Sequence, residues 1–294
     1  MIISASYRTD IPAFYGAWFR RRLEAGFCRT VNPYGGQVSL VPLTGAEVDG
    51  FVFWTRNIEP FQDTLRMLRR SDQPFVVQYT VTGYPRALET SVVAAECSID
   101  LIRGLAAEFG SRSVVWRYDP VVVTSLTPPE WHEATFTALA AALAGVVDEV
   151  VVSIAHIYRK TQRNMDAAAR AHGFTWHDPA DEEKRHLLTR LAAIASAHGM
   201  RLTLCGQAGL LAPGVTAARC IDAERLSDVA GRFISARARP HRPCGCAQSR
   251  DIGDYDTCPH GCVYCYAVSS RTQAKRAFDL HDPDAETLKS GAAS

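Results

Sequence analysis

Residues 149–154 read Glu149-Val150-Val151-Val152-Ser153-Ile154, and this run of β-branched and apolar side chains decides the class of fold. Similar runs occur at 2–6, 50–55, 75–80, 113–118 and 201–205. Continuous apolar runs of this length are typical of strands buried on both faces, as in parallel sheets. The sequence therefore predicts about six buried parallel strands.

Amphipathic segments separate these strands. They lie at 12–25, 59–70, 91–109, 129–144 and 183–198. Alternation of strand and helix predicts an α/β fold with right-handed crossovers. No Gly-x-Gly-x-x-Gly or phosphate-loop motif occurs, so the sequence gives no support for nucleotide binding by those routes.

Polar side chains follow several of the predicted strands. They are Arg8 and Asp10, Thr55-Arg56-Asn57, Thr80, Arg117 with Asp119, Ser153 with His156, and Cys205. A barrel builds its site at the carboxyl ends of many strands, whereas a doubly wound sheet concentrates its site at one switch point. We therefore predict a partial (β/α) barrel, and call the end where these side chains meet its mouth.

The composition excludes several classes of protein. The chain has 294 residues, of which 47% are hydrophobic, with 32 basic against 31 acidic side chains. This balance gives no global reason to bind nucleic acid or an anionic membrane. No stretch approaches the ~20 apolar residues that a membrane span requires. The first residues lack the basic lead-in of a signal peptide, so we expect a cytoplasmic protein that does not bind membranes.

The chain contains nine cysteines, which is unusual for that compartment. Cytosolic thiols stay reduced, so metal ligands or core residues are a better interpretation than disulfides. Cys28 and Cys97 stand alone and are predicted to be small buried side chains. The other seven are concentrated near the C-terminus: Cys205, Cys220, Cys244, Cys246, Cys258, Cys262 and Cys265.

The sharpest motif is Cys258-Pro-His-Gly-Cys262-Val-Tyr-Cys265. Three closely spaced thiolates can bind three irons of a [4Fe–4S] cluster through one loop, which leaves the fourth iron open to another ligand. Zinc is the main alternative. His260 lies inside the motif, with Cys244 and Cys246 close upstream, although structural zinc sites usually repeat a pair of closely spaced cysteines.

The motif, with the aromatic Tyr264 before its last cysteine, resembles that of the radical S-adenosylmethionine enzymes. The resemblance implies that S-adenosylmethionine binds the open iron and that reduction of the cluster cleaves it to a 5′-deoxyadenosyl radical. It also implies a full or partial (β/α) barrel, a flavodoxin or ferredoxin as electron donor, and a substrate, small molecule or other, that the sequence does not identify.

The whole chain also resembles an uncharacterised bacterial family known by a numbered domain of unknown function. The residues that carry this resemblance are Ser4-Ala5-Ser6-Tyr7-Arg8-Thr9-Asp10-Ile11-Pro12-Ala13, Phe53-Trp54-Thr55-Arg56-Asn57, Trp116-Arg117-Tyr118-Asp119-Pro120, Cys220-Ile221-Asp222, Cys244-Gly245-Cys246, Asp251-Ile252-Gly253 and Cys265-Tyr266-Ala267. The resemblance supplies cofactors but no reaction.

One departure from the radical enzymes concerns the position of the loop. Their cysteine loop follows the first barrel strand, whereas here it lies near the C-terminus. We therefore expect a circularly permuted arrangement in which the loop folds back over the mouth near Arg8 and Arg56. The predicted organisation is a barrel over 1–205, a cysteine-rich iron–sulfur extension packed on it over 206–280, and a disordered tail over 281–294.

The remaining predictions concern ligands. Cys205, Cys220, Cys244 and Cys246 equal the complement for a second, auxiliary [4Fe–4S] cluster, unless they are ordinary thiols. Arg8, Arg56 and Arg117 are candidates for holding a carboxylate, and with Tyr264 they form the predicted cofactor-binding set.

The catalytic candidates are Arg8, Asp10, Arg56, Arg117, Asp119 and His156, although internal Arg–Asp pairing would explain several of them equally well. The alternative function is a zinc-stabilised structural or nucleic-acid-binding protein. The basic stretch at 232–242 is a weak signal for nucleic acid because it has little aromatic interleaving.

Overall fold

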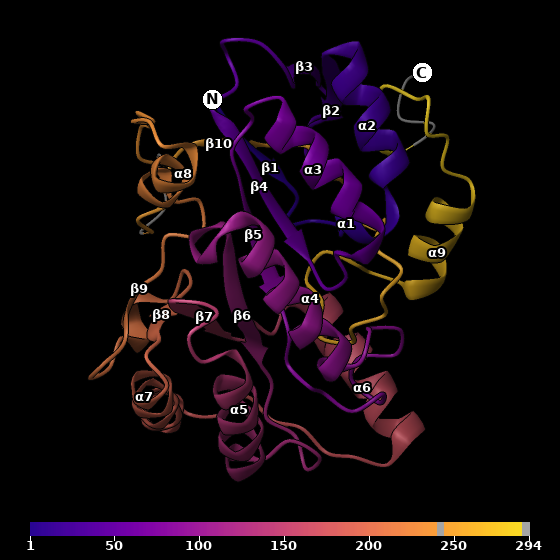
Figure 1. Ribbon diagram of the computed structural model, residues 1–294. Helices are drawn as coiled ribbons and strands as arrows, with labels where there is room; N and C mark the ends of the chain where they lie inside the picture. The colour runs from indigo at the N-terminus through magenta and orange to yellow at the C-terminus, as the bar shows by residue number, and fades with distance from the viewer. Residues whose placement is uncertain (240–243, 290–294) are drawn as a thin grey trace.

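The computed structural model describes residues 1–239 and 244–289 (Figure 1). Its centre is one parallel sheet of eight strands. In spatial order the strands are β10 (Ser249–Asp251), β1 (Ile2–Ala5), β4 (Gly50–Thr55), β5 (Phe75–Thr80), β6 (Val114–Val121), β7 (Glu149–Ile154), β8 (Arg201–Leu204) and β9 (Thr216–Ala217). The α/β prediction is confirmed.

The number of strands differs from the prediction of about six. Each predicted run forms a strand, and the short strands β9 and β10 extend the sheet at its two edges. Within the described residues β9 and β10 do not pair with each other, so the sheet is open. An antiparallel hairpin of β2 (Phe27–Val31) and β3 (Val38–Pro42), which the sequence analysis did not predict, lies outside it.

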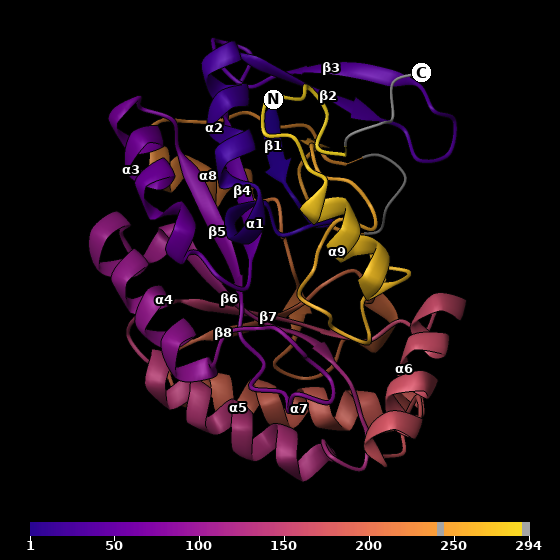
Figure 2. The same ribbon diagram turned by 90° about the vertical axis from the view of Figure 1, so that its right-hand side faces the viewer.

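Helices cover the outer face of the sheet (Figure 2). Those that match the predicted amphipathic segments are α1 (Ile11–Phe14), α2 (Gly16–Ala25), α3 (Gln62–Arg70), α4 (Ala95–Phe109), α5 (Pro129–Leu143) and α7 (Asp181–Ala197). Three further helices were not predicted from the sequence: α6 (Arg159–His172), α8 (Ala223–Ala230) and α9 (Arg271–Asp279). Short 3₁₀ turns are η1 (Glu59–Phe61), η2 (Ser111–Ser113) and η3 (Ala208–Leu210).

Both faces of the sheet are buried, which explains the continuous apolar runs. On the outer face, side chains such as Phe53 and Trp116 pack against the helices. The inner-face residues form a second cluster with the segment that carries α8: Ile2, Val52, Val76, Val115, Val151, Ala218, Cys220, Ile221, Leu226, Ile234, Cys246 and Ala247. The cysteine-bearing segments 218–234 and 246–247 therefore lie against the inner face of the sheet.

The C-terminal tail differs from its predicted disorder. Leu288 is only 3% exposed, Trp18 donates to the carbonyl of Ala285 at 2.9 Å, and Arg29 pairs with Glu286 at 2.6 Å. These contacts cover an apolar surface of α2 and β2, so the prediction is wrong for 281–289. Residues 290–294 lie outside the described residues, as do 240–243 of the basic stretch.

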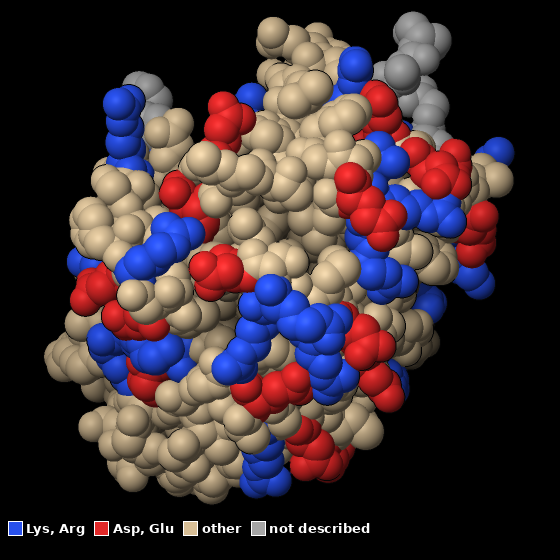
Figure 3. Space-filling model, turned by 45° about the horizontal axis from the view of Figure 1, so that its top comes forward, with Lys and Arg blue, Asp and Glu red and all other residues tan. Residues whose placement is uncertain are grey.

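The surface matches the balanced net charge. On the face drawn in Figure 3, basic and acidic side chains are interspersed. Among the helices that the structure describes, none is both long and apolar enough to span a membrane.

Candidate functional site

The cysteine loop crosses the edge of the sheet at which the parallel strands end, which we call the carboxyl edge. It leaves β10 at Asp251 and is held to the segment that follows β5. The amide of Ser91 donates to the carbonyl of His260 at 2.9 Å, and the amide of Val263 donates to that of Leu88 at 3.0 Å. The loop therefore lies among the ends of β1, β4 and β5, although it is remote from them in sequence.

The three thiols of this loop are close enough to interact electrostatically. Burial raises the pKa of Cys258 and Cys265, and raises that of Cys262 to about 12. Hydrogen bonds act in the opposite direction. The amide of His260 donates to the Cys258 sulfur, and the amide of Ala267 lies 3.4 Å from Cys265 Sγ. The loop thus directs N–H groups at buried sulfurs, which favours thiolates when a cation compensates for their burial.

These thiols do not converge on one point. Among the described residues, no group of three or more His, Cys, Asp or Glu side chains is arranged to hold a single metal ion. A zinc ion requires all its donors within ~2.0–2.3 Å of one centre. A [4Fe–4S] cluster instead takes each cysteine on a different iron. Three thiols on one loop are therefore a donor set that a cluster could use.

Tyr264 is fixed by a buried ion pair. Arg56 Nη2 donates to its hydroxyl at 2.7 Å, and Arg56 Nη1 bonds to Glu89 Oε1 at 2.7 Å. The Tyr264 hydroxyl in turn donates to Glu89, as does Thr82 Oγ1 at 2.7 Å. Glu89 was missed because an isolated carboxylate in the segment after a strand carries no sequence pattern.

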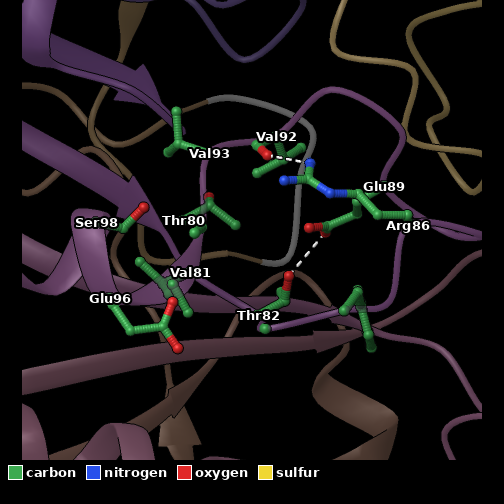
Figure 4. Close-up of a pocket in the computed structure, with 13 residues that line it drawn as sticks. Thr80, Val81, Thr82, Arg86, Glu89, Val92, Val93, Glu96 and Ser98 are labelled. Carbon is green, nitrogen blue, oxygen red and sulfur yellow. Dashed lines mark hydrogen bonds between the residues drawn. The ribbon is translucent and has the colours of Figure 1, made fainter.

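Glu89 also borders a cavity of about 240 Å³ (Figure 4). The cavity is lined mainly by the end of β5, the following segment and the start of α4. Figure 4 shows Glu89 and Thr82 turned toward each other, with the Arg86 guanidinium bonded to the carbonyl of Val92. Glu89 thus lines this cavity and also bonds to Arg56 and Tyr264.

Asp10 connects β1 to the cysteine loop. Its Oδ2 accepts from the amide of Arg56 at 2.7 Å and lies 2.8 Å from His260 Nε2. Its Oδ1 accepts from the amide of Ala13 and so caps α1. His260 packs edge-on against Phe14 at 4.6 Å between ring centroids. Asp10 therefore positions the backbone around the loop, and His260 uses one ring nitrogen to hold Asp10.

Arg8 is the least constrained of the three predicted arginines. Its guanidinium lies over Tyr255 at 5.1 Å, and its Nε is 3.8 Å from Asp251. That Nε is buried without a hydrogen-bond partner. Asp251, which sequence reasoning did not single out, is engaged by the hydroxyls of Ser4 and Ser6 at 2.9 and 2.7 Å. Arg8 is thus held near the loop with donor capacity to spare.

The four remaining cysteines of the cluster of seven lie together on the inner face. Cys205 Sγ and Cys220 Sγ are 3.2 Å apart. Cys220 also contacts Cys246, which contacts Cys244, so the four thiols form a row. The Cys205 thiol lowers the pKa of Cys220, but the Cys246 thiol and burial together outweigh this effect and raise that pKa to about 11.

Arg117 borders this row. Its Nη1 lies 3.3 Å from Cys220 Sγ and 3.2 Å from Gln78 Oε1, and its Nη2 bonds to Asp119 at 2.5 Å. A register shift in the pairing of β6 with β7 sets Asp119 at the carboxyl edge, where Ser153 donates to it. Such irregularities often redirect a side chain beside a functional site. Arg117 and Asp119 are therefore paired internally, next to the cysteine row.

Three predicted residues lie apart from both thiol groups. His156 is exposed, and its Nε2 is 3.4 Å from the side-chain nitrogen of Gln207. Cys28 is buried in the outer core, as predicted. Cys97 is exposed on α4, so the prediction of a buried thiol is wrong there: its position in the helix faces solvent.

Comparison with known proteins identifies a family but no characterised relative. No match to a curated protein was found. A family described as "Domain of unknown function (DUF1848)" matches residues 2–267, which include every strand of the sheet and both thiol groups. The chain therefore belongs to the DUF1848 family.

Proposed function

We propose that this protein is a radical S-adenosylmethionine enzyme with a circularly permuted partial barrel. Cys258, Cys262 and Cys265 would hold a [4Fe–4S] cluster. When bound, the cluster and S-adenosylmethionine supply a one-electron cleavage that generates the 5′-deoxyadenosyl radical. The observation that carries the proposal is the three-thiol loop folded over the carboxyl edge of a parallel sheet, where α/β enzymes assemble their sites.

Strand β10 supports the permutation. It lies at the edge of the sheet beside β1, and the cysteine loop follows it directly. In space the sheet therefore begins with a strand that leads into the cysteine loop and continues through β1, β4 and β5. This is the spatial order of the enzymes that the motif resembles, although the strand comes last in the chain here.

The surrounding residues have distinct proposed roles. Arg8, with its unpartnered buried Nε, is the best placed to bind the carboxylate of S-adenosylmethionine or of a substrate. Arg56 and Glu89 orient Tyr264, and Asp10 holds the adjacent backbone. Arg56 and Arg117 pair closely with carboxylates, at 2.7 and 2.5 Å, whereas Arg8 lies 3.8 Å from Asp251, so we assign Arg56 and Arg117 to positioning.

The row of Cys205, Cys220, Cys244 and Cys246 is the proposed site of an auxiliary [4Fe–4S] cluster. A cluster there would require Cys205 and Cys220 to separate from their present contact. Arg117 would then donate toward the ligand Cys220, and hydrogen bonds to sulfur are one of the factors that set a cluster's potential. The proposal includes a cytoplasmic location, where thiols are kept reduced.

Anaerobic purification followed by iron, sulfide and zinc analysis tests the proposal. We expect about eight irons per chain for two clusters, or about four for one. Stoichiometric zinc without iron would support the zinc-stabilised alternative. Cys246→Ala should remove the iron of the auxiliary site and leave that of the first, which separates the two assignments.

Cleavage of S-adenosylmethionine tests the reaction class directly. Reconstituted protein with dithionite should release 5′-deoxyadenosine, whereas Cys262→Ala should not. Cys97→Ala is the matched control because Cys97 is exposed and lies outside both thiol groups. Equal release by wild type and Cys262→Ala would rule out the assigned cluster.

A further inference from the structure

Helix α6 carries a row of arginines along one side. Arg159, Arg163 and Arg170 are exposed and, with Asp166, are spaced by four, three and four residues. Residues at this spacing lie on one face of a helix. Together with Gln162 they line a shallow surface groove. We call Arg159, Arg163 and Arg170 the arginine stripe.

The arginine stripe lacks the carboxylate partners found elsewhere on the protein. Arginines such as Arg112 and Arg225 are each paired with two carboxylates. None of the three stripe arginines forms an ion pair with any residue that the structure describes. Asp166, the only acidic residue of the helix, instead accepts from Trp176 Nε1 at 3.0 Å. The stripe is therefore a surface of net positive charge, with Asp166 as the acidic side chain in its groove.

Local helix electrostatics favour Arg170, which lies in the last turn of α6, but do not explain Arg159. Arg159 and Lys160 begin α6, whose first turn holds no acidic residue and whose N-cap makes no side-chain hydrogen bond. The N-terminal end of a helix carries partial positive charge, so cations there are unfavourable. Residues that destabilise their own helix without a compensating local contact are expected at functional positions.

Helix α6 is directly joined to the segment that follows the cysteine loop. Arg163 Nη2 donates to the carbonyl of Ser269 at 2.7 Å, and Asn164 Nδ2 lies 3.4 Å from that of Val268. Lys160 lies over Tyr255 at 5.3 Å, on the ring that also contacts Arg8. The stripe is thus the cationic surface next to the proposed catalytic loop.

We propose that the arginine stripe of α6 is the docking surface for an acidic, one-electron donor protein. This inference rests on the proposed function, which requires an external electron. A reduced flavodoxin represents the class of donor: its hydroquinone gives up one electron and becomes a semiquinone, and the cluster held by the adjacent loop takes up that electron.

The size of the stripe favours a protein over nucleic acid. Arg159 and Arg170, the two ends of the stripe, are 11 residues apart on one helix, about 16 Å at 1.5 Å per residue. Electron-transfer encounters are among the smallest specific interfaces, and charge complementarity steers them. Nucleic-acid-binding domains instead usually have a pI above about 9, whereas the pI of this chain is about 7.6.

Charge reversal provides the test. Arg159→Glu with Arg170→Glu alters two exposed side chains outside both thiol groups. Its matched control is Arg70→Glu with Arg232→Glu, two exposed arginines on α3 and after α8, away from α6 (Figure 1). The measurements are the affinity for oxidised flavodoxin by fluorescence titration and the flavodoxin-driven release of 5′-deoxyadenosine.

We expect the stripe variant to bind flavodoxin about tenfold more weakly than wild type. Its flavodoxin-driven release of 5′-deoxyadenosine should fall in proportion, whereas its dithionite-driven release should be unchanged. The control variant should match wild type, and added salt should weaken binding to wild type more than to the stripe variant. The inference would be overturned if all three proteins bound flavodoxin with equal affinity. It would also be overturned if the stripe bound DNA and not flavodoxin. Absence of dithionite-driven release in wild type would instead refute the proposed function.

Discussion

The buried pair of Arg56 and Glu89 gives a direct test of how the cysteine loop is held. The side chains of Arg56 and Glu89 are only 11% and 5% exposed, and their closest N–O distance is 2.7 Å. Glu89→Gln keeps the size of the side chain, and its amide oxygen can still accept from an N–H group of Arg56. It leaves the Arg56 guanidinium buried without a neutralising charge.

The expected cost follows from this burial. Removing one partner of a buried ion pair destabilises a protein by ~3–5 kcal/mol, because the other charge stays desolvated. We expect about 3 kcal/mol for Glu89→Gln, the lower end, since the amide oxygen still accepts. The half-exposed pair of Arg190 and Glu133 is the control. Glu133→Gln should cost no more than about 1 kcal/mol.

Urea unfolding at neutral pH, followed by circular dichroism under anaerobic conditions, measures both values. The double variant Arg56→Met with Glu89→Gln should recover most of the loss, because no buried charge remains. Iron content after reconstitution should fall in Glu89→Gln, since an amide oxygen is a weaker acceptor than a carboxylate for the Tyr264 hydroxyl. A loss for Glu89→Gln as small as that for Glu133→Gln would refute the view that this pair anchors the loop.

Further predictions concern other parts of the molecule. Burial lowers the pKa of His132 from 6.5 to about 4. As the pH falls, the unfolded chain therefore binds a proton at this histidine before the folded chain does. The stability of the fold is full above about pH 6.5 and falls by up to about 3 kcal/mol as the pH approaches 4. His132→Gln should flatten this dependence in urea unfolding measured at several pH values, and parallel curves would exclude it. Gly253→Ala would place a Cβ 2.0 Å from Ser6 Oγ, so we expect reduced cluster uptake after reconstitution, whereas normal iron content would contradict the packing described. Leu288→Ala should cost ~2–5 kcal/mol in urea unfolding, while no change would restore the prediction of a disordered tail.

The strands could be predicted because burial on both faces leaves a strong signal in the residues themselves. The run 149–154 is apolar on its outer and inner faces, and the strand has the predicted bounds. Helix α6 was missed because few apolar side chains define its buried face: Thr161, Met165 and Ala168. Its buried side packs against Tyr264 and Val263 of the cysteine loop, a contact that sequence periodicity does not record.

The candidate site was predictable where chemistry is carried by residue type and spacing. The seven C-terminal cysteines were separated into groups of three and four, and the structure places each group together. Glu89 and Asp251 were not predicted as site residues, because each acts through partners that are far away in sequence. Arg56 and Arg117 were named as ligand-binding residues, but a sequence does not show that each already has a carboxylate partner.

Strand β10 shows why the proposed site depends on the whole chain. It has three residues, Ser249 to Asp251, with no apolar alternation, and it exists because it pairs with β1. Asp251 then receives hydrogen bonds from Ser4 and Ser6, which precede it by 247 and 245 residues. A contact across such a separation carries a loop-closure cost, which is smaller once the intervening strands are ordered. The loop that follows β10 is held at the carboxyl edge through the pairing of β10 with β1, so we expect cluster insertion to require a nearly complete fold.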